Sequence, residues 1–567
     1  MNPLKDKRHT FIHGKKDRQI LFLGKDKDQV EERLASWKEQ KFSQKLRAKD
    51  HTVWFPEPKP EITDRLGWLE LPEVMQERLE AFETFARGVK EEGVSRVVLL
   101  GMGGSSLASE VFQKTFGNAP GHPGLFVLDS THPSAIRSME EKVDLSRTLF
   151  LVSSKSGTTL ETLSLFRYFW KEMSSLTDKP GHHFVAITDP ETPLMKLAQD
   201  RDFRMVFQSN PDVGGRYSAL TDFGLVPAAL IGADIHRLLD RARIAYENTA
   251  FSVSEDKASS LILGAALGEL AKSRDKLTFV TSPSLDSFPD WLEQLIAESI
   301  GKDGKGIIPV VGEPQASMEE YGKDRFFVCL SLEGDSGRYE EKLKKLEEAG
   351  HPTLLIYLKD KYDLGQEIFR WEVAVASAGS ILGIHPFNQP DVQLAKDLAR
   401  NAMERKKDSQ GKSDDAVEAF SVDEPEGLAG ALKNWIAQAQ GGDYITLQAY
   451  LFPNVDTTEV LQKIRIGLLK HKQITTTMGY GPRFLHSTGQ LHKGGPNIGL
   501  FLQLVDEPSV DLSIPETDYS FNTLIKAQAL GDYQALKQRG RRVLRINLKS
   551  DVSGGLDRLK DLMENLG

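Results

Sequence analysis

The sequence predicts an α/β protein in which parallel β-sheets are covered by helices on both faces. From about residue 65 onward, short runs of apolar and β-branched residues alternate with amphipathic stretches of helical length. Near-continuous apolar strands separated by helices are typical of parallel sheets that are buried on both sides. Two of the runs pass directly into turns rich in Gly, Ser and Thr, which is where such sheets bind ligands. The runs of this first unit span residues 96–100, 125–128, 149–152 and 184–187.

The rest of the chain is expected to form three further parts. Residues 1–64 make a charged N-terminal segment of helical and extended character, and the first unit spans residues 65–250. A second unit of the same class spans residues 251–410, and a third α/β unit spans residues 411–567. The polar stretch 405–415 is expected to be a solvated linker. The strands expected in these parts are residues 19–23, then 277–280, 326–330 and 353–357, then 444–447, 498–502 and 543–546.

The composition excludes several functional classes. The net charge of −9 and the pI near 5.9 argue against non-specific nucleic-acid binding and favour a cytoplasmic protein. Cys329 is the only cysteine, so neither an intrachain disulfide nor a cysteine-based metal cluster is possible, and its apolar neighbours predict that it is buried. The charged N-terminus lacks the apolar region of a signal peptide, and no apolar run is long enough to span a membrane.

The first Gly-rich turn, Gly103-Gly104-Ser105-Ser106, lies between a predicted strand and a predicted helix. Glycines allow the backbone to approach an anion closely, and the helix N-terminus offers unpaired N–H groups. The turn lacks the Lys of a Walker A loop, and its Gly spacing does not fit the dinucleotide fingerprint. It is therefore a candidate phosphate site, although a tight turn without a ligand would give the same pattern.

The second turn between a strand and a helix presents several hydroxyl groups and one ammonium group. Hydroxyl and N–H groups can enclose a phosphate dianion without a metal. One Ser or Thr would be enough to cap the helix, so the density of hydroxyl groups favours a phosphoester site. The residues of this turn are Ser154, Lys155, Ser156, Gly157, Thr158 and Thr159.

Two charged residues are candidates for acid–base chemistry. Arg216 follows Gly214 and Gly215, so its side chain can extend into a cleft with little obstruction, although a surface arginine is the alternative. Glu298 falls in the last turn of a predicted helix, where the helix dipole disfavours a carboxylate. Such a conflict with a local rule is mild evidence for function, against the alternative of an exposed glutamate.

The remaining candidates lie in two segments rich in Pro or Gly. Pro390 can begin the helix that carries Lys396, with Gln389 just before it, and a solvated lysine is the alternative. Farther along, His486 and His492 occur six residues apart among glycines, which suggests a loop that lines a cleft. Zinc is not expected there, because no third ligand is suitably spaced and the His-Glu-x-x-His pattern is absent. We therefore expect neither a metal nor a cofactor.

Together, these segments resemble the glucose-6-phosphate isomerase family. The resemblance covers about residues 40–560 and is strongest to the isomerase half of bacterial bifunctional transaldolase–phosphoglucose isomerases. The region before residue 96 is too short for a transaldolase barrel of about 250 residues, so a stand-alone isomerase is expected. Each motif is weak alone, but the set in this order is specific: Gly-x-Gly-Gly-Ser, Ser-Lys-x-x-Thr-Thr-x-Glu-Thr, Val-Gly-Gly-Arg-Tyr-Ser, Glu-Ser-x-Gly-Lys and Phe-Asn-Gln-Pro-x-Val-x-x-x-Lys.

The resemblance implies two sugar-isomerase (SIS) α/β/α sandwiches, a homodimer, and reversible conversion of glucose 6-phosphate to fructose 6-phosphate without a metal. It implies that Glu298 is the general base between C2 and C1 and that Arg216 stabilises the cis-enediolate. Gln389 would contact the substrate, and Lys396 would assist ring opening. The sugar phosphate would be bound by Gly104, Ser105, Ser154, Lys155, Ser156 and Thr159.

The ring-opening histidine of the family pattern occurs at a different place in this sequence. The histidine that opens the sugar ring lies between the Glu and Lys motifs in better-known members, but here that interval contains only His351 and His385. The segment that ends in His492 is similar to the family's sequence around that histidine, although it follows the Lys motif. Our hypothesis is that His492 supplies the ring-opening acid or base, and His486 is the next candidate.

Two alternative functions use the same fold. An isomerase with relaxed stereochemistry at C2 would also accept mannose 6-phosphate and needs the same phosphate site and base. A non-catalytic sugar-phosphate sensor would keep the hydroxyl-rich turns but would need no base. The presence of Glu298, Arg216 and Lys396 beside those turns argues against the sensor.

Overall fold

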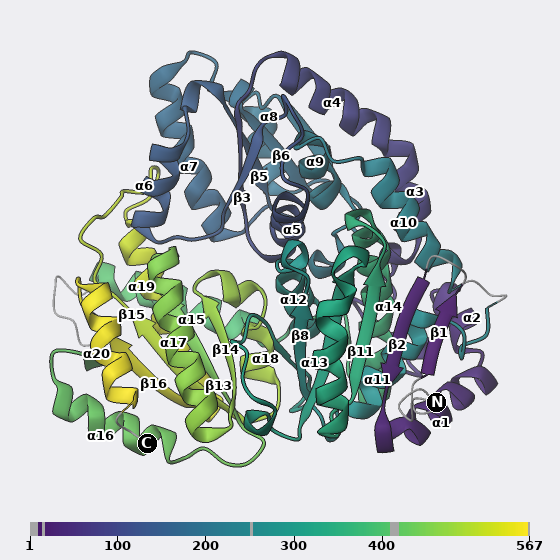
Figure 1. Cartoon of the computed structure of the whole chain (residues 1–567). Coiled ribbons are helices and arrows are strands. Elements are labelled where there is room, and N and C mark those ends of the chain that lie inside the picture. Colours follow the sequence, from purple (N-terminus) through teal and green to yellow (C-terminus); the bar gives the residue numbers. More distant parts are fainter. Residues whose placement is uncertain (1–8, 14–16, 250–252, 409–418, 565–567) are drawn as a thin grey trace.

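Three β-sheets organise the chain in the computed structural model, which describes residues 9–13, 17–249, 253–408 and 419–564. The first sheet lies above the other two in Figure 1, with the second at the lower right and the third at the lower left. Each sheet carries helices on its faces, as the sequence predicted. Among the described residues, no helix is both long and apolar enough to cross a membrane.

The first sheet has five parallel strands in the order β4-β3-β5-β6-β7. Side chains alternate between its faces: Val97 and Leu99 join one apolar core with α4, α5 and α9, whereas Val98 and Leu100 join another with α6, α7 and α8. Both faces are therefore covered, which explains why the strands are apolar throughout. The strands are β3 (Arg96–Gly101), β4 (Gly124–Leu128), β5 (Thr148–Ser153), β6 (Phe184–Thr188) and β7 (Met205–Gln208), and the helices are α4 (Leu79–Glu91), α5 (Leu107–Phe116), α6 (Pro133–Lys142), α7 (Leu160–Leu176), α8 (Pro193–Asp200) and α9 (Asp222–Leu230).

The second sheet is mixed rather than wholly parallel. Its four parallel strands β11, β10, β8 and β9 are extended by a hairpin from the N-terminus, in which β2 pairs antiparallel with β11. This pairing occupies the edge of β11, and an antiparallel neighbour needs no crossover helix. Cys329 on β10 is fully buried, as predicted. The bounds are β1 (His9–His13), β2 (Asp17–Phe22), β8 (Lys276–Thr281), β9 (Ile308–Val310), β10 (Arg325–Leu332) and β11 (Thr353–Leu358), with α10 (Ile235–Glu247), α11 (Ser259–Leu270), α12 (Phe288–Ile300), α13 (Ser336–Glu348) and α14 (Leu364–Leu382).

The third sheet is parallel, in the order β12-β16-β15-β13-β14. Helix α15 precedes it and packs along α19. The same helix includes residues 405–408 of the expected linker, and residues 409–415 lie outside the described residues. The bounds are β12 (Phe420–Ser421), β13 (Tyr444–Tyr450), β14 (Thr475–Tyr480), β15 (Gly499–Val505) and β16 (Arg542–Asn547), with α15 (Val392–Asp408), α16 (Pro425–Ile436), α17 (Val455–Lys472), α18 (Gly489–Gly494), α19 (Phe521–Gln538) and α20 (Val552–Glu564).

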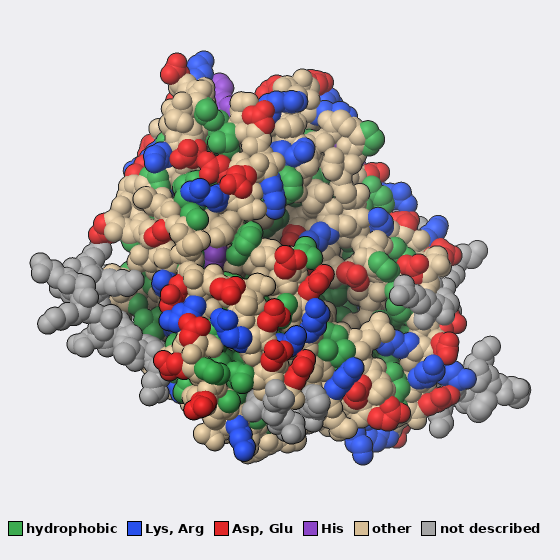
Figure 2. All heavy atoms as spheres, turned by 60° about the vertical axis from the view of Figure 1, so that its left-hand side comes forward, with side chains coloured by type: hydrophobic (Ala, Val, Ile, Leu, Met, Phe, Trp, Pro, Cys, Tyr) green, Lys and Arg blue, Asp and Glu red, His purple; other side chains and the backbone are tan. Residues whose placement is uncertain are grey.

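The third unit packs directly on the first. Phe521 and Leu524 at the start of α19 belong to the same apolar core as helices α6 and α7, and the ring of Phe521 lies 6.0 Å from that of Tyr168. On the face seen in Figure 2, Lys and Arg side chains are interspersed with Asp and Glu, and hydrophobic side chains form small groups. The first and third units therefore meet through buried apolar side chains.

Candidate active site

The first Gly-rich turn is shaped by close contacts with two other loops. Strand β3 ends at Gly101, and a short 3₁₀ turn, Gly103–Ser105, leads into α5. A Cβ atom on Gly104 would lie 2.0 Å from the carbonyl oxygen of Gly215, and one on Gly103 would lie 2.6 Å from that of His486. Only glycine fits at these two positions. Their lack of a side chain lets the turn lie in direct contact with the loops that carry Arg216 and His486.

The second turn connects β5 to α7 and presents its hydroxyl groups in pairs. The Ser154 and Thr159 hydroxyls are 2.9 Å apart, as are those of Ser156 and Thr158. Gly157 has φ +67°, and a Cβ atom there would lie 2.7 Å from the Cβ atom of Thr192. Within the described chain, no side chain caps the N-terminus of α7, so its first N–H groups stay available for an anion.

Lys155 differs from the other residues of this turn. Its ammonium group donates to Asp189 and to the carbonyl oxygen of Asn210, the latter at 3.4 Å. Burial lowers the pKa of Lys155, although the Asp189 carboxylate opposes the shift. The ammonium group is therefore engaged by Asp189, a partner that the sequence did not reveal.

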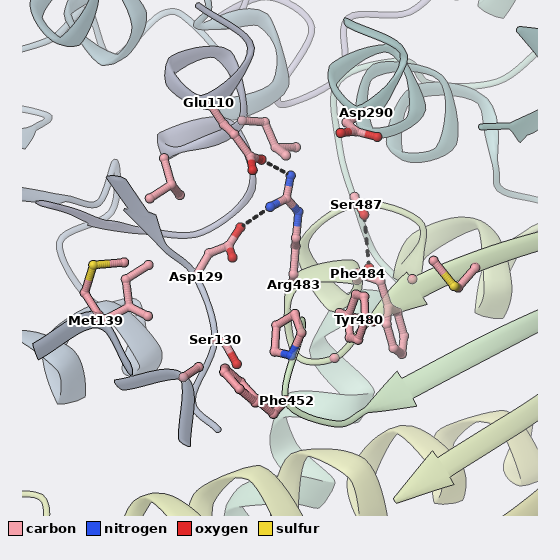
Figure 3. A pocket seen from close by; sticks show the side chains of 18 of the residues that line it. Glu110, Asp129, Ser130, Met139, Asp290, Phe452, Tyr480, Arg483, Phe484 and Ser487 are labelled. Atoms are coloured by element: carbon pink, nitrogen blue, oxygen red, sulfur yellow. Dashed lines mark hydrogen bonds and ion pairs between the residues drawn. The ribbon is translucent and has the colours of Figure 1, made fainter. Parts of the chain in front are cut away.

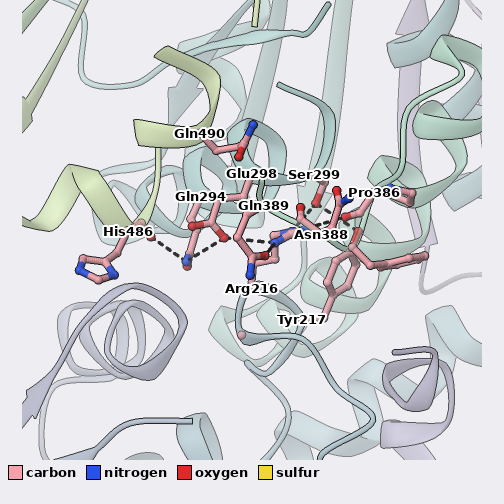
Figure 4. A network of polar contacts seen from close by, with 12 residues as sticks. Arg216, Tyr217, Gln294, Glu298, Ser299, Pro386, Asn388, Gln389, His486 and Gln490 are labelled. Atoms are coloured by element: carbon pink, nitrogen blue, oxygen red, sulfur yellow. Dashed lines mark hydrogen bonds and ion pairs between the residues drawn. The ribbon is translucent and has the colours of Figure 1, made fainter. Parts of the chain in front are cut away.

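Arg216 is the centre of a buried polar network (Figure 4). It is the middle residue of a short 3₁₀ turn, Gly215–Tyr217, and is only 2% exposed. Its guanidinium donates to the Glu298 carboxylate at 3.3 Å, to the Gln389 amide oxygen at 2.9 Å and to the Ser299 hydroxyl at 2.9 Å. Two backbone carbonyls accept as well, those of Pro386 and Asn388. The structure thus brings together Arg216, Glu298 and Gln389 from segments far apart in the sequence.

Glu298 lies in the last turn of α12 and is 8% exposed. Burial raises the pKa of this carboxyl group, and the nearby charges of Arg216 and His486 offset only part of the shift. Gln294, one helical turn earlier, donates to Glu298 at 3.5 Å and to the His486 carbonyl at 2.8 Å. A carboxylate in this setting is held in place and is more basic than an exposed glutamate.

Lys302 fixes the segment that faces Arg216. It is buried, and its ammonium group donates to the carbonyl oxygens of His385 and Asn388 and to the side chain of Asn388. Burial, together with the charge of Arg216, lowers the pKa of Lys302 well below its usual value. Arg216 and Lys302 therefore both bind backbone carbonyls of residues 385–388. These bonds hold Gln389 toward Arg216.

The two histidines of the Gly-rich segment lie in different environments. His486 ends a 3₁₀ turn next to Gly103, and its Nε2 lies 3.0 Å from Glu161 in the first turn of α7. His492 is buried beside the third sheet, where its ring contacts Phe501 and its Nδ1 lies 3.2 Å from the Gln448 amide nitrogen. Burial lowers the pKa of His492 well below its usual value. The His486 carbonyl is linked to Glu298 through Gln294, whereas the described contacts of His492 lie with the third sheet.

Lys396 projects from α15 and is exposed. This agrees with the alternative of a solvated lysine. Its positive charge nevertheless contributes to lowering the pKa of Glu161, the partner of His486.

A separate pocket of about 380 Å³ lies beside the His486 loop (Figure 3). Arg483 at its centre binds Glu110 and Asp129. Two more acids line the pocket, and burial raises the pKa of Asp290 to about 6 and that of Glu293 to about 8. The acidic lining disfavours a phosphate dianion, so the Gly-rich turns are the better substrate site. Across the described ranges, no three His, Cys, Asp or Glu residues are grouped so that they could hold a metal ion.

Several residues of the site were missed by the sequence reasoning. Glu161 and Lys302 stand inside quoted motifs, at fixed offsets from Ser154 and Glu298, so the motifs contained a signal for them. Gln294 lies one helical turn before Glu298, a spacing that places both on the same face of α12. Asn388 acts partly through its backbone carbonyl, which no residue type reveals.

Comparison with known proteins identifies relatives of the chain. A family model described as phosphoglucose isomerase matches residues 64–309. The glucose-6-phosphate isomerase of Rubrobacter xylanophilus is 28% identical over 394 residues, which is 61% of this chain and 90% of the relative. The probable glucose-6-phosphate isomerase of Natronomonas pharaonis is 30% identical over 345 residues, which is 54% of this chain and 78% of the relative.

Two solved structures share the fold. A hypothetical protein of Thermus thermophilus aligns with a TM-score of 0.58 at 26% identity and covers 67% of this chain and 99% of its own. A glucose-6-phosphate isomerase of Chlamydia trachomatis aligns with a TM-score of 0.59 at 16% identity, covering 76% of this chain and 93% of its own, and is a likeness of fold alone.

Proposed function

The chain belongs to the phosphoglucose isomerase family and catalyses the reversible isomerisation of glucose 6-phosphate and fructose 6-phosphate; from this premise we propose how its residues divide the reaction. The observation that carries the proposal is the buried contact between Arg216 and Glu298, next to two Gly-rich turns whose helices begin there. Isomerisation needs a base at C2 and C1, a positive charge at the enediolate, an anion site for the phosphate, and a proton donor at the ring oxygen.

The phosphate binds at the two turns. Hydroxyl groups of Ser105, Ser154, Ser156 and Thr159 and the amide of Gly104 supply donors, and the N-termini of α5 and α7 add their unpaired N–H groups. Lys155 acts through its backbone amide and its long-range charge, because its ammonium group is bound to Asp189. Support comes from the absence of a side-chain cap on either helix in the described structure.

Glu298 is the general base that moves a proton between C2 and C1. Its raised pKa suits this role, because a base is most effective when its pKa approaches the working pH. Arg216 cannot release a proton near neutral pH, so it supplies charge to the enediolate oxygens. Gln389 and Gln294 flank the pair and position the sugar hydroxyls.

His486, and not His492, is the ring-opening residue in this proposal. Its position beside Gly103 and its pairing with Glu161 support the role, whereas His492 is buried among aromatic rings with a strongly lowered pKa. Lys396 assists from the solvent-facing side of the same region, where its charge acts on Glu161.

The domain boundaries, the oligomeric state and the cellular location are proposed from the family resemblance. We propose that the chain divides at about residues 65, 251 and 411, that the N-terminal hairpin belongs to the second unit, and that the enzyme forms a homodimer in the cytoplasm. The separate sheets support the division, and the pairing of β2 with β11 supports the assignment of the hairpin.

The decisive experiment measures isomerisation with a chelator present and compares Glu298→Gln with the wild type. The variant is expected to bind fructose 6-phosphate but to exchange the C2 proton with solvent at least about 100-fold more slowly, which is the usual contribution of a general base. Glu293→Gln is the matched control on α12, because its carboxyl group faces the neighbouring pocket. Activity that is restored only by metal, or normal exchange in Glu298→Gln, would contradict the mechanism.

A further inference from the structure

A chain of buried hydrogen bonds links the first and third units behind His486. The Thr131 hydroxyl donates to the Gln528 amide oxygen at 2.8 Å, and the Gln528 amide nitrogen donates to Glu161 at 2.7 Å. The same carboxylate oxygen of Glu161 lies 3.0 Å from Nε2 of His486. Thr131, Gln528 and Glu161 are all less than 7% exposed. Gln528 is on α19 and His486 precedes α18, whereas Thr131 and Glu161 belong to the first unit.

The direction of these bonds, together with the charge of Glu161, indicates the protonation of their members. Because the Gln528 oxygen accepts from Thr131, the amide turns its N–H₂ group toward Glu161. An amide N–H₂ can only donate, so the Glu161 oxygen that it meets accepts this hydrogen bond. Because the Glu161 pKa is also lowered, the carboxylate is ionised and the same oxygen accepts from His486, which requires a proton on Nε2 and leaves Nδ1 for exchange with the substrate.

The charges around Glu161 agree with this direction. Burial alone would raise the pKa of Glu161, but His486 and the more distant Lys396 bring it below its usual value. Burial raises the pKa of Tyr450, at the end of β13, well above the usual value, and the charge of Glu161 adds to this shift, so Tyr450 is neutral and adds no charge. Glu161 is therefore anionic when His486 works.

We propose that Gln528 is a positioning residue for the ring-opening step, because it holds Glu161 as an acceptor and thereby fixes the tautomer and orientation of His486. The inference rests on the proposed role of His486. Apolar contacts of Phe521 and Leu524 already attach α19 to the first unit, so docking does not require this polar chain. Buried polar groups cost free energy unless all are satisfied, and here each finds its partner in the one arrangement that prepares His486.

The experiment compares Gln528→Leu and Gln528→Glu with the control Gln503→Leu. Gln503 is buried under the same helix and donates to the carbonyl of Ala529, but it does not touch Glu161. Three quantities are measured: turnover of glucose 6-phosphate against pH, turnover of 5-deoxyfructose 6-phosphate, and the ¹⁵N chemical shifts of His486. The deoxy compound lacks the hydroxyl that closes the ring, so it enters the reaction in the open form.

Gln528→Leu is expected to lower kcat for glucose 6-phosphate about 10-fold or more at every pH, to leave the deoxy compound unaffected, and to remove the preference of His486 for a proton on Nε2. Gln528→Glu should work normally at low pH, where a protonated carboxyl group donates as the amide does. It should lose activity as pH rises, when the introduced carboxyl group and Glu161 lose the proton that they share.

Equal kcat, pH profiles and His486 shifts in Gln528→Leu and Gln503→Leu would overturn the proposal. Equal losses on both substrates would overturn it too, because they would reveal a general structural role. If His486→Gln keeps full turnover on glucose 6-phosphate, the assignment of His486 fails instead, and the ¹⁵N shifts still decide whether Gln528 orients the imidazole.

Discussion

The contact between Arg216 and Glu298 sets the basicity of the proposed catalytic carboxylate. Burial raises the pKa of Glu298 and Arg216 lowers it, so the two effects act in opposite directions. Replacement of Arg216 by Met removes the lowering effect and also the charge that stabilises the enediolate. We expect kcat to fall about 100-fold or more and the acid limb of kcat/KM to move to higher pH. The pH profiles of the two proteins check this, and an unmoved acid limb would exclude Glu298 as the group that titrates.

His486 and His492 can be separated by the form of the substrate. His486→Gln should lower turnover of glucose 6-phosphate by about 100-fold or more, because the ring no longer receives its proton, and should spare 5-deoxyfructose 6-phosphate. His492→Gln should affect both substrates equally, and only through stability, since its ring is packed against Phe484 and Phe501. The reverse pattern in the two variants would restore His492 as the ring-opening residue.

Residue types and spacing predicted part of the site and could not predict the rest. Arg216, Glu298 and Gln389 were found because each follows or precedes a recognisable turn, and the structure brings them into contact. The choice between two histidines six residues apart depends on how the segment folds: a 3₁₀ turn directs His486 to Glu161, while the short helix α18 directs His492 inward. The ion pair of Lys155 with Asp189 also joins residues that only the folded sheet brings together.

At the scale of elements, the two Gly-rich turns depend on close backbone contact. A Cβ atom on Gly104 would lie 2.0 Å from the Gly215 carbonyl, so Gly104→Ala must push the turns apart by about 1 Å, and a displacement of that size typically costs about 100-fold in rate. Gly215→Ala is the matched control, because its Cβ atom meets nothing within 4 Å. Steady-state kinetics of both variants test this, and equal activities would contradict it.

Helix α14 carries a carboxyl group that opposes stability at high pH. Glu372 is fully buried, and in the described structure neither carboxyl oxygen has a hydrogen-bond partner. Burial raises its pKa well above 4.5 in the folded state, so the unfolded chain ionises first and stability falls as pH rises from about 4.5 toward the folded pKa. Each unit of the shift costs about 1.4 kcal/mol.

Replacement of Glu372 by Gln should therefore raise the Tm at pH 8 by about 2 °C or more and change it little at pH 4. Glu367→Gln on the same helix is the contrasting variant, since Glu367 pairs with Arg370 at 3.1 Å and its loss should destabilise. Calorimetry at both pH values distinguishes the two, and a Glu372→Gln protein that is less stable at pH 8 would contradict the linkage.

Strands were predictable where the apolar run was long, whereas the three-residue strand β9 is apolar but was not predicted. Strand β14, Thr475–Tyr480, was missed because its Thr-rich sequence lacks a hydrophobic run, although pairing with β13 makes it part of the sheet. The strand near residue 19 was found, but its antiparallel pairing with β11 depends on a contact more than 300 residues away along the chain.

At the scale of the whole molecule, the described site draws its residues from all three units of one chain. The first contributes the turns and Glu161, the second Arg216's partner Glu298, and the third His486. Specific activity should therefore be independent of enzyme concentration from micromolar to nanomolar, even if a homodimer dissociates. Activity and mass measured over the same dilution series check this, and a joint decline would indicate that a second copy completes the site.

The supply of His486 by the third unit also has a consequence for synthesis. Ribosomes synthesise the chain from its N-terminus, and domains generally fold in the order in which they are made. The turns, Arg216 and Glu298 emerge before any part of the third sheet. A nascent or truncated chain is then expected to convert linear sugar phosphates before cyclic ones, so competence for the ring form is acquired last.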